Sequence, residues 1–271
     1  MRVTVLVTQF NDPRVERTLR SLAQQTRAPD DVLIADGGSR PELLEVMRRW
    51  GGANVRVESH PGSVAATRAS ALRSLYGKTD AVVFLDTDQV APPTWLGALV
   101  APIEEERADV TGGPTRPLAP PTTEGERYLN DFEEWFYPNV VAHDMTKLPM
   151  GNSAWRVELL ERIGGFDERL RWGGEDYDVN LRAAKAGARA TYVPEAWVHH
   201  DQSGRNDLRS ILRRKYRYNV GAALAYMKNG VLGERMRAST SARFRHPWER
   251  WNLVVQPLAL ARAMTLRRRV R

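Results

Sequence analysis

Two carboxylates stand two residues apart in the sequence D-T-D at Asp86 and Asp88, directly after the apolar run Ala81–Leu85. Burying both side chains in a core would carry a large desolvation cost, so they are expected at an exposed strand end. There they can bind a hard divalent cation, whose remaining ligands come from water or phosphate oxygens. The alternative is a carboxylate that caps the following helix. The motif therefore predicts a metal site or a helix cap.

The sequence D-G-G-S at residues 36–39 also follows an apolar run. Its glycines let a ligand approach the backbone closely, and Asp36 offers an acceptor to a donor group of a base or a ribose. The alternative is an ordinary tight turn in which Ser39 caps the next helix. Further along the chain, Arg68 lies in the first turns of an expected helix. Its guanidinium can bind a diphosphate there or remain a solvated surface charge.

The sequence W-G-G-E-D-Y-D at residues 172–178 places acidic residues at the start of a helix. Carboxylates in that position interact favourably with the helix dipole, which is the structural interpretation. The functional interpretation is a general base that takes a proton from an acceptor hydroxyl. Because adjacent helical residues diverge by about 100°, we expect only one of Glu175 and Asp176 to face that hydroxyl.

His199 and His200 follow the extended segment Ala196–Val198. A histidine at the end of a strand can be a hydrogen-bonded structural residue. Alternatively, a neutral imidazole can complete the coordination of a metal ion that carboxylates already hold. The pair therefore adds a candidate metal ligand to the D-T-D motif.

The elements that carry these motifs alternate between strands and helices in the first half of the chain. Short apolar runs predict strands, and apolar positions at helical spacing predict helices between them. This order predicts an α/β fold with a mainly parallel sheet flanked by helices, in which ligands bind at the carboxyl ends of the strands. The predicted strands are Val3–Thr8, Val32–Ala35, Val55–Val57 and Ala81–Leu85, and the predicted helices are Arg14–Gln24, Pro41–Trp50 and Val64–Tyr76.

The second half of the chain is less regular. Four prolines between residues 114 and 121 predict a loop, and the glycine at 151 predicts a turn over Gly151–Ser153. Later segments regain helical spacing, and the last apolar stretch ends at a run of arginines. The predicted helices are Glu124–Trp135, Tyr177–Ala186 and Leu208–Met227, the extended segments are Ala190–Val193 and Ala196–Val198, and the apolar stretch is Trp251–Met264.

Composition limits the class of protein. The 271 residues are 42% apolar and 27% charged, which supports a sizeable core and excludes a mostly disordered chain. The absence of cysteine excludes disulfides and thiolate metal sites. The sequence has no run of about 18 apolar residues, so no membrane-spanning helix is expected. The first residues also lack the features of a signal peptide. We therefore expect a cytoplasmic protein.

Charge is divided unevenly along the chain. From Arg205 to Arg271 there are 17 basic and 3 acidic residues, a balance of +14, whereas residues 1–204 carry a balance of −7. An acidic body with a basic end predicts that the end binds a polyanion, either nucleic acid or an anionic membrane surface. The end also has apolar and aromatic residues, which would anchor it in a membrane interface or pack on the body or a second subunit. These residues are Trp248, Trp251, Leu253, Val254, Val255, Leu258 and Leu260.

The order and spacing of the motifs resemble those of the family 2 glycosyltransferases of the GT-A (Rossmann-like) fold. The likeness covers about residues 3–204 and includes T-x-F-N, D-G-G-S, D-T-D, G-N-S-A-W-R, I-G-G-F-D-E, G-G-E-D-Y-D and V-H-H. The resemblance implies a nucleotide-diphosphate-sugar donor, with Thr8 and Asp36 at the nucleoside, Arg68 near the diphosphate and Asp86 near the ribose or sugar. Phe10, in the first motif, is a further donor-binding residue on the same basis.

The resemblance also assigns roles on the metal and acceptor sides. Asp88 would bind a divalent metal, Mn²⁺ or Mg²⁺, and His199, or alternatively His200, would be a second ligand. Asp176 would be the catalytic base, and Glu175 and Trp172 would bind the acceptor. The expected organisation is a glycosyltransferase domain at 1–204, with a nucleotide-sugar half at 1–115 and an acceptor half at 116–204, followed by a basic helical extension at 205–271.

The function expected from this resemblance is a metal-dependent, inverting transfer of a sugar to an acceptor hydroxyl. The acceptor would be a glycan or a lipid-linked molecule in cell-surface glycan or glycolipid synthesis, and the enzyme would be cytoplasmic or peripheral at the inner face of the cell membrane. One alternative is a basic-tailed nucleic-acid-binding protein, against which stand the acidic body and the lack of a recognisable nucleic-acid-binding module. Another is a non-catalytic nucleotide-sugar binder, against which stand the intact Asp88 and Asp176.

Overall fold

The computed structural model describes residues 1–50, 54–204, 207–237 and 245–270. In this part of the chain a seven-stranded sheet has the order β3-β2-β1-β4-β8-β6-β9. Most neighbours pair in parallel, whereas β8 runs antiparallel to β4 and β6. The predicted mainly parallel α/β sheet is confirmed. Its strands are β1 (Val3–Gln9), β2 (Asp31–Asp36), β3 (Val55–Ser59), β4 (Ala81–Asp86), β6 (Val110–Gly112), β8 (Ser153–Arg156) and β9 (Ala190–Tyr192).

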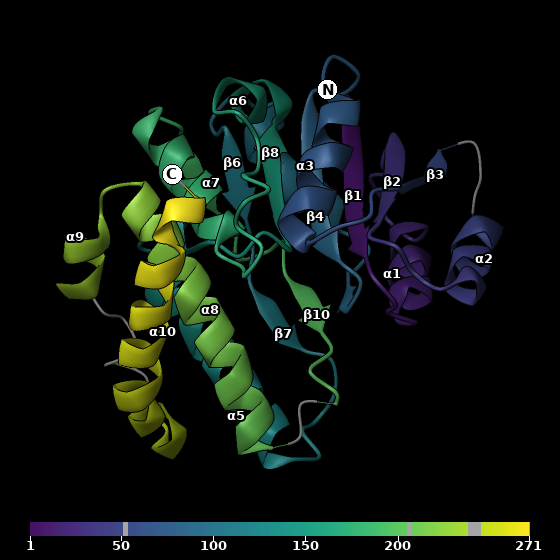
Figure 1. Cartoon of the computed structure of the whole chain (residues 1–271). Coiled ribbons are helices and arrows are strands. Elements are labelled where there is room, and N and C mark those ends of the chain that lie inside the picture. The colour runs from purple at the N-terminus through teal and green to yellow at the C-terminus, as the bar shows by residue number, and fades with distance from the viewer. Residues whose placement is uncertain (51–53, 205–206, 238–244, 271) are drawn as a thin grey trace.

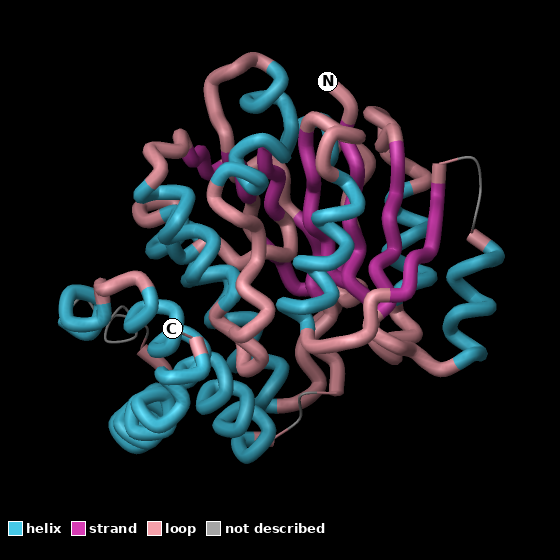
Figure 2. Tube along the Cα trace, turned by 45° about the horizontal axis from the view of Figure 1, so that its top comes forward, coloured by secondary structure: helices cyan, strands magenta, loops and turns pink. Residues whose placement is uncertain are grey.

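Helices cover both faces of this sheet (Figures 1 and 2). Successive side chains of a strand point to opposite faces, so Val5 joins the core on one face and Leu6 the core on the other. Because both faces are covered, β1, β2 and β4 are apolar almost throughout. The first core contains side chains of α1 (Val15–Leu22), α2 (Pro41–Arg49) and α4 (Trp95–Glu104), and the second those of α3 (Val64–Leu75), α6 (Val157–Arg162) and α7 (Glu175–Lys185).

Strand register brings the predicted motifs to one edge of the sheet. Thr8 pairs with Ala35 of β2 on one side and with Asp86 of β4 on the other, and Gln9 pairs with Asp36. Parallel strands that are aligned in this way end together. The D-G-G-S and D-T-D motifs therefore follow the same edge, which we call the carboxyl edge.

A second, three-stranded sheet lies beyond the carboxyl edge, in the order β5-β10-β7. Strand β5 (Gln89–Val90) follows β4 after a tight turn, and β10 (Val198–His200) pairs with it in an antiparallel manner. Strand β7 (Thr115–Pro117) pairs with β10 in parallel and packs against α5 (Glu124–Phe136). A π-helical turn at Tyr137–Val141 and a 3-10 turn at Met145–Lys147 then lead back to the main sheet.

The basic end of the chain is helical and packs on the rest of the protein (Figure 1). Its first helix, α8, contacts α7 and α5, and α10 lies along α8. Ala259 and Ala263 of α10 are buried in a core shared with α8, whereas Leu253 and Leu258 are exposed. The elements are α8 (Leu208–Lys228), α9 (Leu232–Arg237), a 3-10 turn (Pro247–Trp251), α10 (Asn252–Leu266) and a 3-10 turn (Arg267–Arg269).

Arg205 and Arg271, which limit the predicted basic extension, lie outside the described residues. Among the helices that are described, none combines the length and the apolar character that a membrane span requires. The alternative in which Trp251–Leu260 packs on the protein holds for one face of α10, which packs mainly on α8.

Candidate functional site

Arg68 stands at the centre of the carboxyl edge and connects three of the predicted site residues. Its buried guanidinium donates to Asp86 Oδ1 at 2.8 Å and to Glu175 Oε1 at 3.0 Å, and its Nε donates to Thr8 Oγ1 at 3.3 Å. A buried cation is tolerated only with such partners, and its removal would leave two carboxylates close together. Arg68 thus belongs to the site and is not a solvated surface charge.

The turn after β2 is held by hydrogen bonds to its own backbone. The buried carboxylate of Asp36 accepts from the N–H groups of Gly38 and Ser39 at 3.0 Å. The alternative in which Ser39 caps the next helix is wrong, because Arg40 is the N-cap residue of α2, and Ser39 Oγ instead accepts from the N–H of Asn11 at 2.9 Å. Phe10, beside this turn, is 63% exposed. Asp36 therefore shapes the loop, and Phe10 offers an open aromatic face at the same edge.

Asp86 and Asp88 differ in their surroundings. Asp86 is 38% exposed and pairs with Arg68. Asp88 is less exposed, and its Oδ2 lies 3.2 Å from Nε2 of His200 and 3.8 Å from a guanidinium nitrogen of Arg14. The two carboxylates consequently face different partners: Asp86 is linked to Glu175 through Arg68, and Asp88 faces His200 of the second sheet.

His200, and not His199, faces Asp88, so the preference for His199 as the metal ligand is corrected. Neighbouring residues of a strand point to opposite sides. His199 turns away, and its Nδ1 contacts the carbonyl oxygen of Pro117 at 3.0 Å. His200 pairs with Gln89 in β5, which places its ring beside the D-T-D loop. The alternative ligand of the pair is the one with suitable geometry.

His200 lies between two carboxylates. Its Nε2 contacts Asp88 and its Nδ1 contacts Glu133 Oε1 of α5 at 2.9 Å. Burial by itself would lower the pKa of His200, but the carboxylates of Glu133 and Asp88 outweigh burial and raise the pKa to about 9. The ring is therefore held protonated in this arrangement, and it would have to release the proton of Nε2 before it could bind a metal ion.

The residues around Asp88 suit a hard or borderline divalent cation in part. A carboxylate oxygen and an imidazole nitrogen are ligands that Mn²⁺ accepts. Within the described residues, no group of three or more His, Asp or Glu side chains is arranged to hold a metal ion. Asp88 and His200 would therefore supply two ligands, and water and a diphosphate the others, as is usual for such cations at phosphate sites.

Glu175 and Asp176, which we call the E-D pair, lie at the start of α7, as the sequence predicts. The two side chains have different surroundings. Glu175 is buried and bound to Arg68. Asp176 is partly buried and accepts from the N–H of Tyr177 at 2.8 Å. Burial, and then the nearby charge of Glu175, raise the pKa of the Asp176 carboxyl to about 7. A carboxyl group with this pKa can exchange a proton near neutral pH.

The backbone of the loop before the E-D pair packs directly against the backbone of α8. A side chain at Gly174 would overlap the carbonyl group of Gly221, and one at Gly221 would overlap the backbone of Gly173. Trp172, at the start of the loop, is 42% exposed and has the Arg262 guanidinium 5.8 Å from its ring centre. Helices α8 and α10 of the basic end therefore contact the loop that leads to Glu175 and Asp176.

From this contact we predict different effects of alanine at two helical glycines on the stability of the fold. Gly221→Ala should destabilise the fold by about 1–3 kcal/mol, because the added methyl group has no space. Gly233→Ala is the matched control, since nothing lies within 4 Å of a methyl group there, and it should be neutral or stabilising by up to about 1 kcal/mol. Urea unfolding measures both values. Equal effects of the two substitutions would contradict the close contact.

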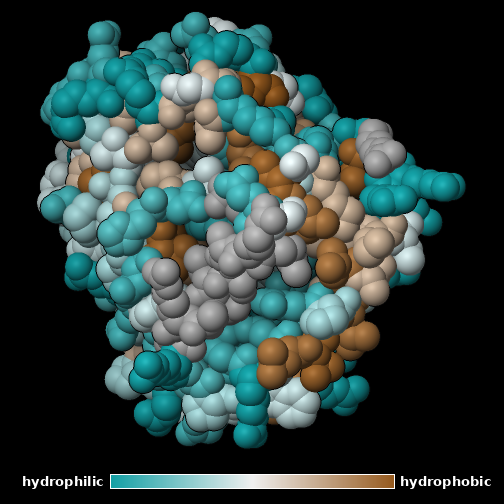
Figure 3. Space-filling view, turned by 90° about the vertical axis from the view of Figure 1, so that its left-hand side faces the viewer, coloured by the Kyte–Doolittle hydropathy of each residue, from teal (hydrophilic) through white to brown (hydrophobic). Residues whose placement is uncertain are grey.

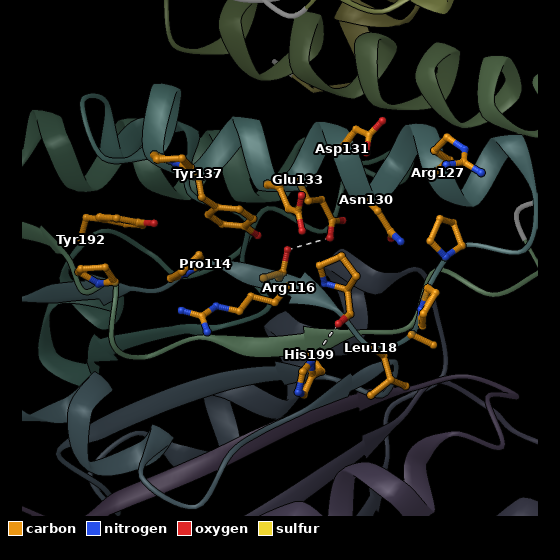
Figure 4. A pocket seen from close by; sticks show the side chains of 18 residues that line it. Pro114, Arg116, Leu118, Arg127, Asn130, Asp131, Glu133, Tyr137, Tyr192 and His199 are labelled. Atoms are coloured by element: carbon orange, nitrogen blue, oxygen red, sulfur yellow. Dashed lines mark hydrogen bonds between the residues drawn. The ribbon is translucent and has the colours of Figure 1, made fainter.

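A pocket of about 830 Å³ lies between β7 and α5, and its lining includes Glu133, which contacts His200 (Figure 4). The proline-rich loop at 114–121 forms one wall of the pocket, and Tyr137 belongs to the opposite wall. Thr115 Oγ1 donates to Glu133 Oε2 at 2.8 Å, and Glu133 also holds His200. His199 lines this pocket. Glu133 thus separates the pocket from Asp88.

The geometry agrees with the result of a family comparison. Residues 1–220 match the family model described as "Glycosyltransferase like family 2". The chain belongs to glycosyltransferase family 2. The matched region extends beyond the predicted domain limit at 204 and includes most of α8, the helix that contacts the E-D loop.

Several relatives in the family are moderately similar in sequence. Pre-mycofactocin glycosyltransferase of Mycobacterium tuberculosis is 30% identical, with 76% of this chain and 44% of the relative aligned. Chondroitin synthase of Pasteurella multocida is 24% identical over 74% of this chain and 25% of its own length. O-antigen biosynthesis protein RfbC of Myxococcus xanthus is 26% identical over 75% and 18%. The chain thus spans less than half the length of these relatives.

Solved structures show that this family 2 chain has the predicted GT-A fold. A mannosyltransferase from Pyrobaculum calidifontis, in complex with GDP-Man and Mn²⁺, has a TM-score of 0.66 at 20% identity, over 99% of this chain and 83% of that one. GalNAc-T7 with UDP, GalNAc and Mn²⁺ has a TM-score of 0.62 at 15% identity, over 96% and 56%. The similarity covers the helical end as well as the sheet.

Sequence reasoning missed several residues that shape the family 2 site. Glu133 lies in a predicted helix, but helical spacing alone did not distinguish it from other acidic residues. Arg14 precedes α1, and one of its guanidinium nitrogens lies 3.8 Å from Asp88 Oδ2. Gly151 has no space for a side chain because a Cβ would overlap Asp86 Oδ2. The glycine of G-N-S-A-W-R was the available signal for such a close approach.

Proposed function

We propose that this protein transfers a sugar from a nucleotide-diphosphate-sugar to an acceptor hydroxyl, with inversion at the anomeric carbon and with a divalent cation. The observation that carries the proposal is the buried Arg68, which joins Asp86 on the donor side to Glu175 on the acceptor side. The proposed donor-side and acceptor-side residues are thereby held at one edge of the sheet, where ligands of open α/β sheets bind. The proposed division is 1–115 for the donor, 116–204 for the acceptor and 205–271 for the basic extension.

Side chains at the ends of β1, β2 and β4 form the donor side of the proposed site. Thr8, Phe10 and the loop held by Asp36 receive the nucleoside, and Asp86 lies near the ribose or sugar. Asp88 and His200 would hold Mn²⁺ or Mg²⁺. When bound there, the cation neutralises the charge of the departing diphosphate.

Asp176 is the proposed base on the acceptor side. Its carboxylate takes the proton of the acceptor hydroxyl, whose oxygen then attacks the anomeric carbon as the bond to the nucleoside diphosphate breaks. One displacement inverts the configuration at that carbon. Trp172 offers an exposed aromatic face on which a sugar ring of the acceptor can pack. Glu175, held by Arg68, positions the acceptor end of the site.

The names of the relatives support a glycan or lipid-linked acceptor in cell-surface glycan or glycolipid synthesis. Two of them are a chondroitin synthase and an O-antigen biosynthesis protein. Two structural neighbours contain GDP-Man or UDP. We propose that the present protein uses a nucleotide sugar of this general class in the cytoplasm, at or near the inner face of the cell membrane.

A thermal-shift panel of nucleotide sugars, with and without Mn²⁺, tests this function. A ligand at about 100 times its dissociation constant stabilises the folded state by about 2.7 kcal/mol, and we expect the matching donor to raise the melting temperature by roughly 5–10 °C in Mn²⁺. A much smaller shift is expected without metal. If no nucleoside diphosphate or nucleotide sugar changes the melting temperature under either condition, the proposal fails. Binding without any turnover would favour the non-catalytic alternative.

A further inference from the structure

Helix α10 has an apolar face that points away from the protein. Ala259, Ala263 and Leu266 lie in the core that α10 shares with α8. The opposite side carries Leu253, which is 82% exposed, and Leu258, which is 58% exposed. Val254 and Met264 are also exposed on this helix. Figure 3 looks at the side of the molecule where α9 and α10 lie, and hydrophobic residues gather on its right-hand half among hydrophilic ones.

Exposed arginines lie before and after these apolar residues in the sequence. Residues 245–270 include six arginines and one acidic residue, Glu249. The carboxylate of Glu249 faces inwards, where it pairs with Lys215 Nζ at 2.6 Å. All six arginines are exposed: Arg245, Arg250, Arg262, Arg267, Arg268 and Arg269. The apolar side chains are therefore set in a positively charged surface without an outward-facing carboxylate from this segment.

We propose that this face docks on an anionic lipid bilayer. We call it the α10 surface and define it by Leu253, Val254, Leu258 and Met264 together with the arginine run at 267–269. Apolar side chains of a surface helix enter the boundary between headgroups and acyl chains, while arginines meet the lipid phosphates. Residues 1–204 carry a balance of −7 and would be repelled. Charge complementarity thus sets the orientation of the docked protein.

The α10 surface adjoins the acceptor side of the site. Arg262 of α10 lies over the ring of Trp172. Leu170, from the loop before the E-D pair, is buried in the core between α8 and α10. If the proposed function holds, docking would place the Trp172 edge near the bilayer, where an acceptor carried by a lipid is found. Binding to the bilayer itself does not depend on transferase activity.

Vesicle flotation of the full chain tests the proposal directly. We expect binding to vesicles of phosphatidylcholine and phosphatidylglycerol, no binding to phosphatidylcholine alone, and loss of binding at high salt. Arg268→Gln with Arg269→Gln should weaken binding roughly 30-fold, since each basic residue near an anionic leaflet contributes roughly fivefold. Leu253→Gln with Leu258→Gln should weaken it roughly tenfold or more by removing apolar contact.

Matched controls replace an exposed arginine pair and an exposed apolar residue on another surface with glutamine. Arg48→Gln with Arg49→Gln alters two exposed arginines of α2, and Val64→Gln alters an exposed apolar residue of α3. Both controls should retain vesicle binding.

Three outcomes would overturn the proposal. One is equal recovery with both lipids, and another is loss of binding in the control variants to the same extent. The third is that the α10 variants change the oligomeric state or salt-dependent nucleic-acid binding while vesicle binding stays unchanged. In that case the face serves a second copy or a nucleic acid. Donor-induced thermal shifts, measured on the same variants, keep this result separate from a failure of the proposed function.

Discussion

Asp176→Asn is expected to slow sugar transfer by about 100- to 10,000-fold while donor affinity stays unchanged, because it removes the proton acceptor and keeps the shape of the side chain. The pKa of about 7 predicts the pH dependence as well. In the wild type, the rate constant kcat/KM should rise with pH below about 7 and level off above it, as Asp176 loses its proton. The variant should lack this rise of kcat/KM with pH. Steady-state kinetics over pH 5–9 measure both effects.

Stability provides an independent measurement on the same variant. Because the pKa of Asp176 is raised in the folded state, the folded protein holds this proton more tightly than the unfolded chain does. The contribution of Asp176 to the stability of the wild type therefore falls as pH rises from about 4 to about 7, and Asp176→Asn should melt at a higher temperature than the wild type above pH 7. Reduced donor affinity with intact turnover would assign Asp176 to the donor side instead.

Asp178→Asn is the matched control for Asp176→Asn because it makes the same change two residues later. Asp178 is fully buried and accepts from Arg182, Lys228 and Asn229. Its neutralisation weakens the ion pairs that this buried carboxylate makes with Arg182 and Lys228, although Lys228 also contacts Asp167, and should cost about 3–5 kcal/mol. The two substitutions should thus shift the melting temperature in opposite directions above pH 7. Shifts of the same sign would contradict the different roles assigned to the two carboxylates.

Asp88→Asn is expected to reduce transfer on the order of 1,000-fold and to weaken nucleoside-diphosphate binding in Mn²⁺. The reason is that a metal ion supplies several kcal/mol of charge stabilisation at a departing diphosphate, and Asp88 is its proposed carboxylate ligand. Binding measured by calorimetry in EDTA should be the same for wild type and variant. Asp80→Asn, which changes an exposed carboxylate just before β4, should leave both properties unchanged. An Asp88→Asn variant with wild-type donor affinity in Mn²⁺ would contradict the role of Asp88.

The sequence predicts the donor half of the fold well because its signals are local. Strands β1, β2 and β4 are buried on both faces and therefore form continuous apolar runs, and polar motifs begin where these runs end. The start of α7 is also visible, since two glycines precede a group of carboxylates. Each of these features depends on neighbours in the sequence.

The elements that depend on tertiary contacts could not be predicted in this way. Strand β8 begins at Ser153, inside a predicted turn, and is held in an antiparallel position by β4 and β6 on its two sides. Helix α4 contains Pro102, which interrupts the helical pattern in the sequence. The difference between His199 and His200 rests on a register of one residue in β10, which is set by pairing with β5 and β7.

We propose above that this carboxyl edge performs metal-dependent sugar transfer. The most direct test of this proposal is the release of nucleoside diphosphate from the donor that stabilises the protein most, measured with a glycan or lipid-linked acceptor in Mn²⁺ and again in EDTA. We expect acceptor-dependent release in Mn²⁺ that falls to background in EDTA and returns when Mn²⁺ is added back. Equal release in Mn²⁺ and in EDTA would contradict it.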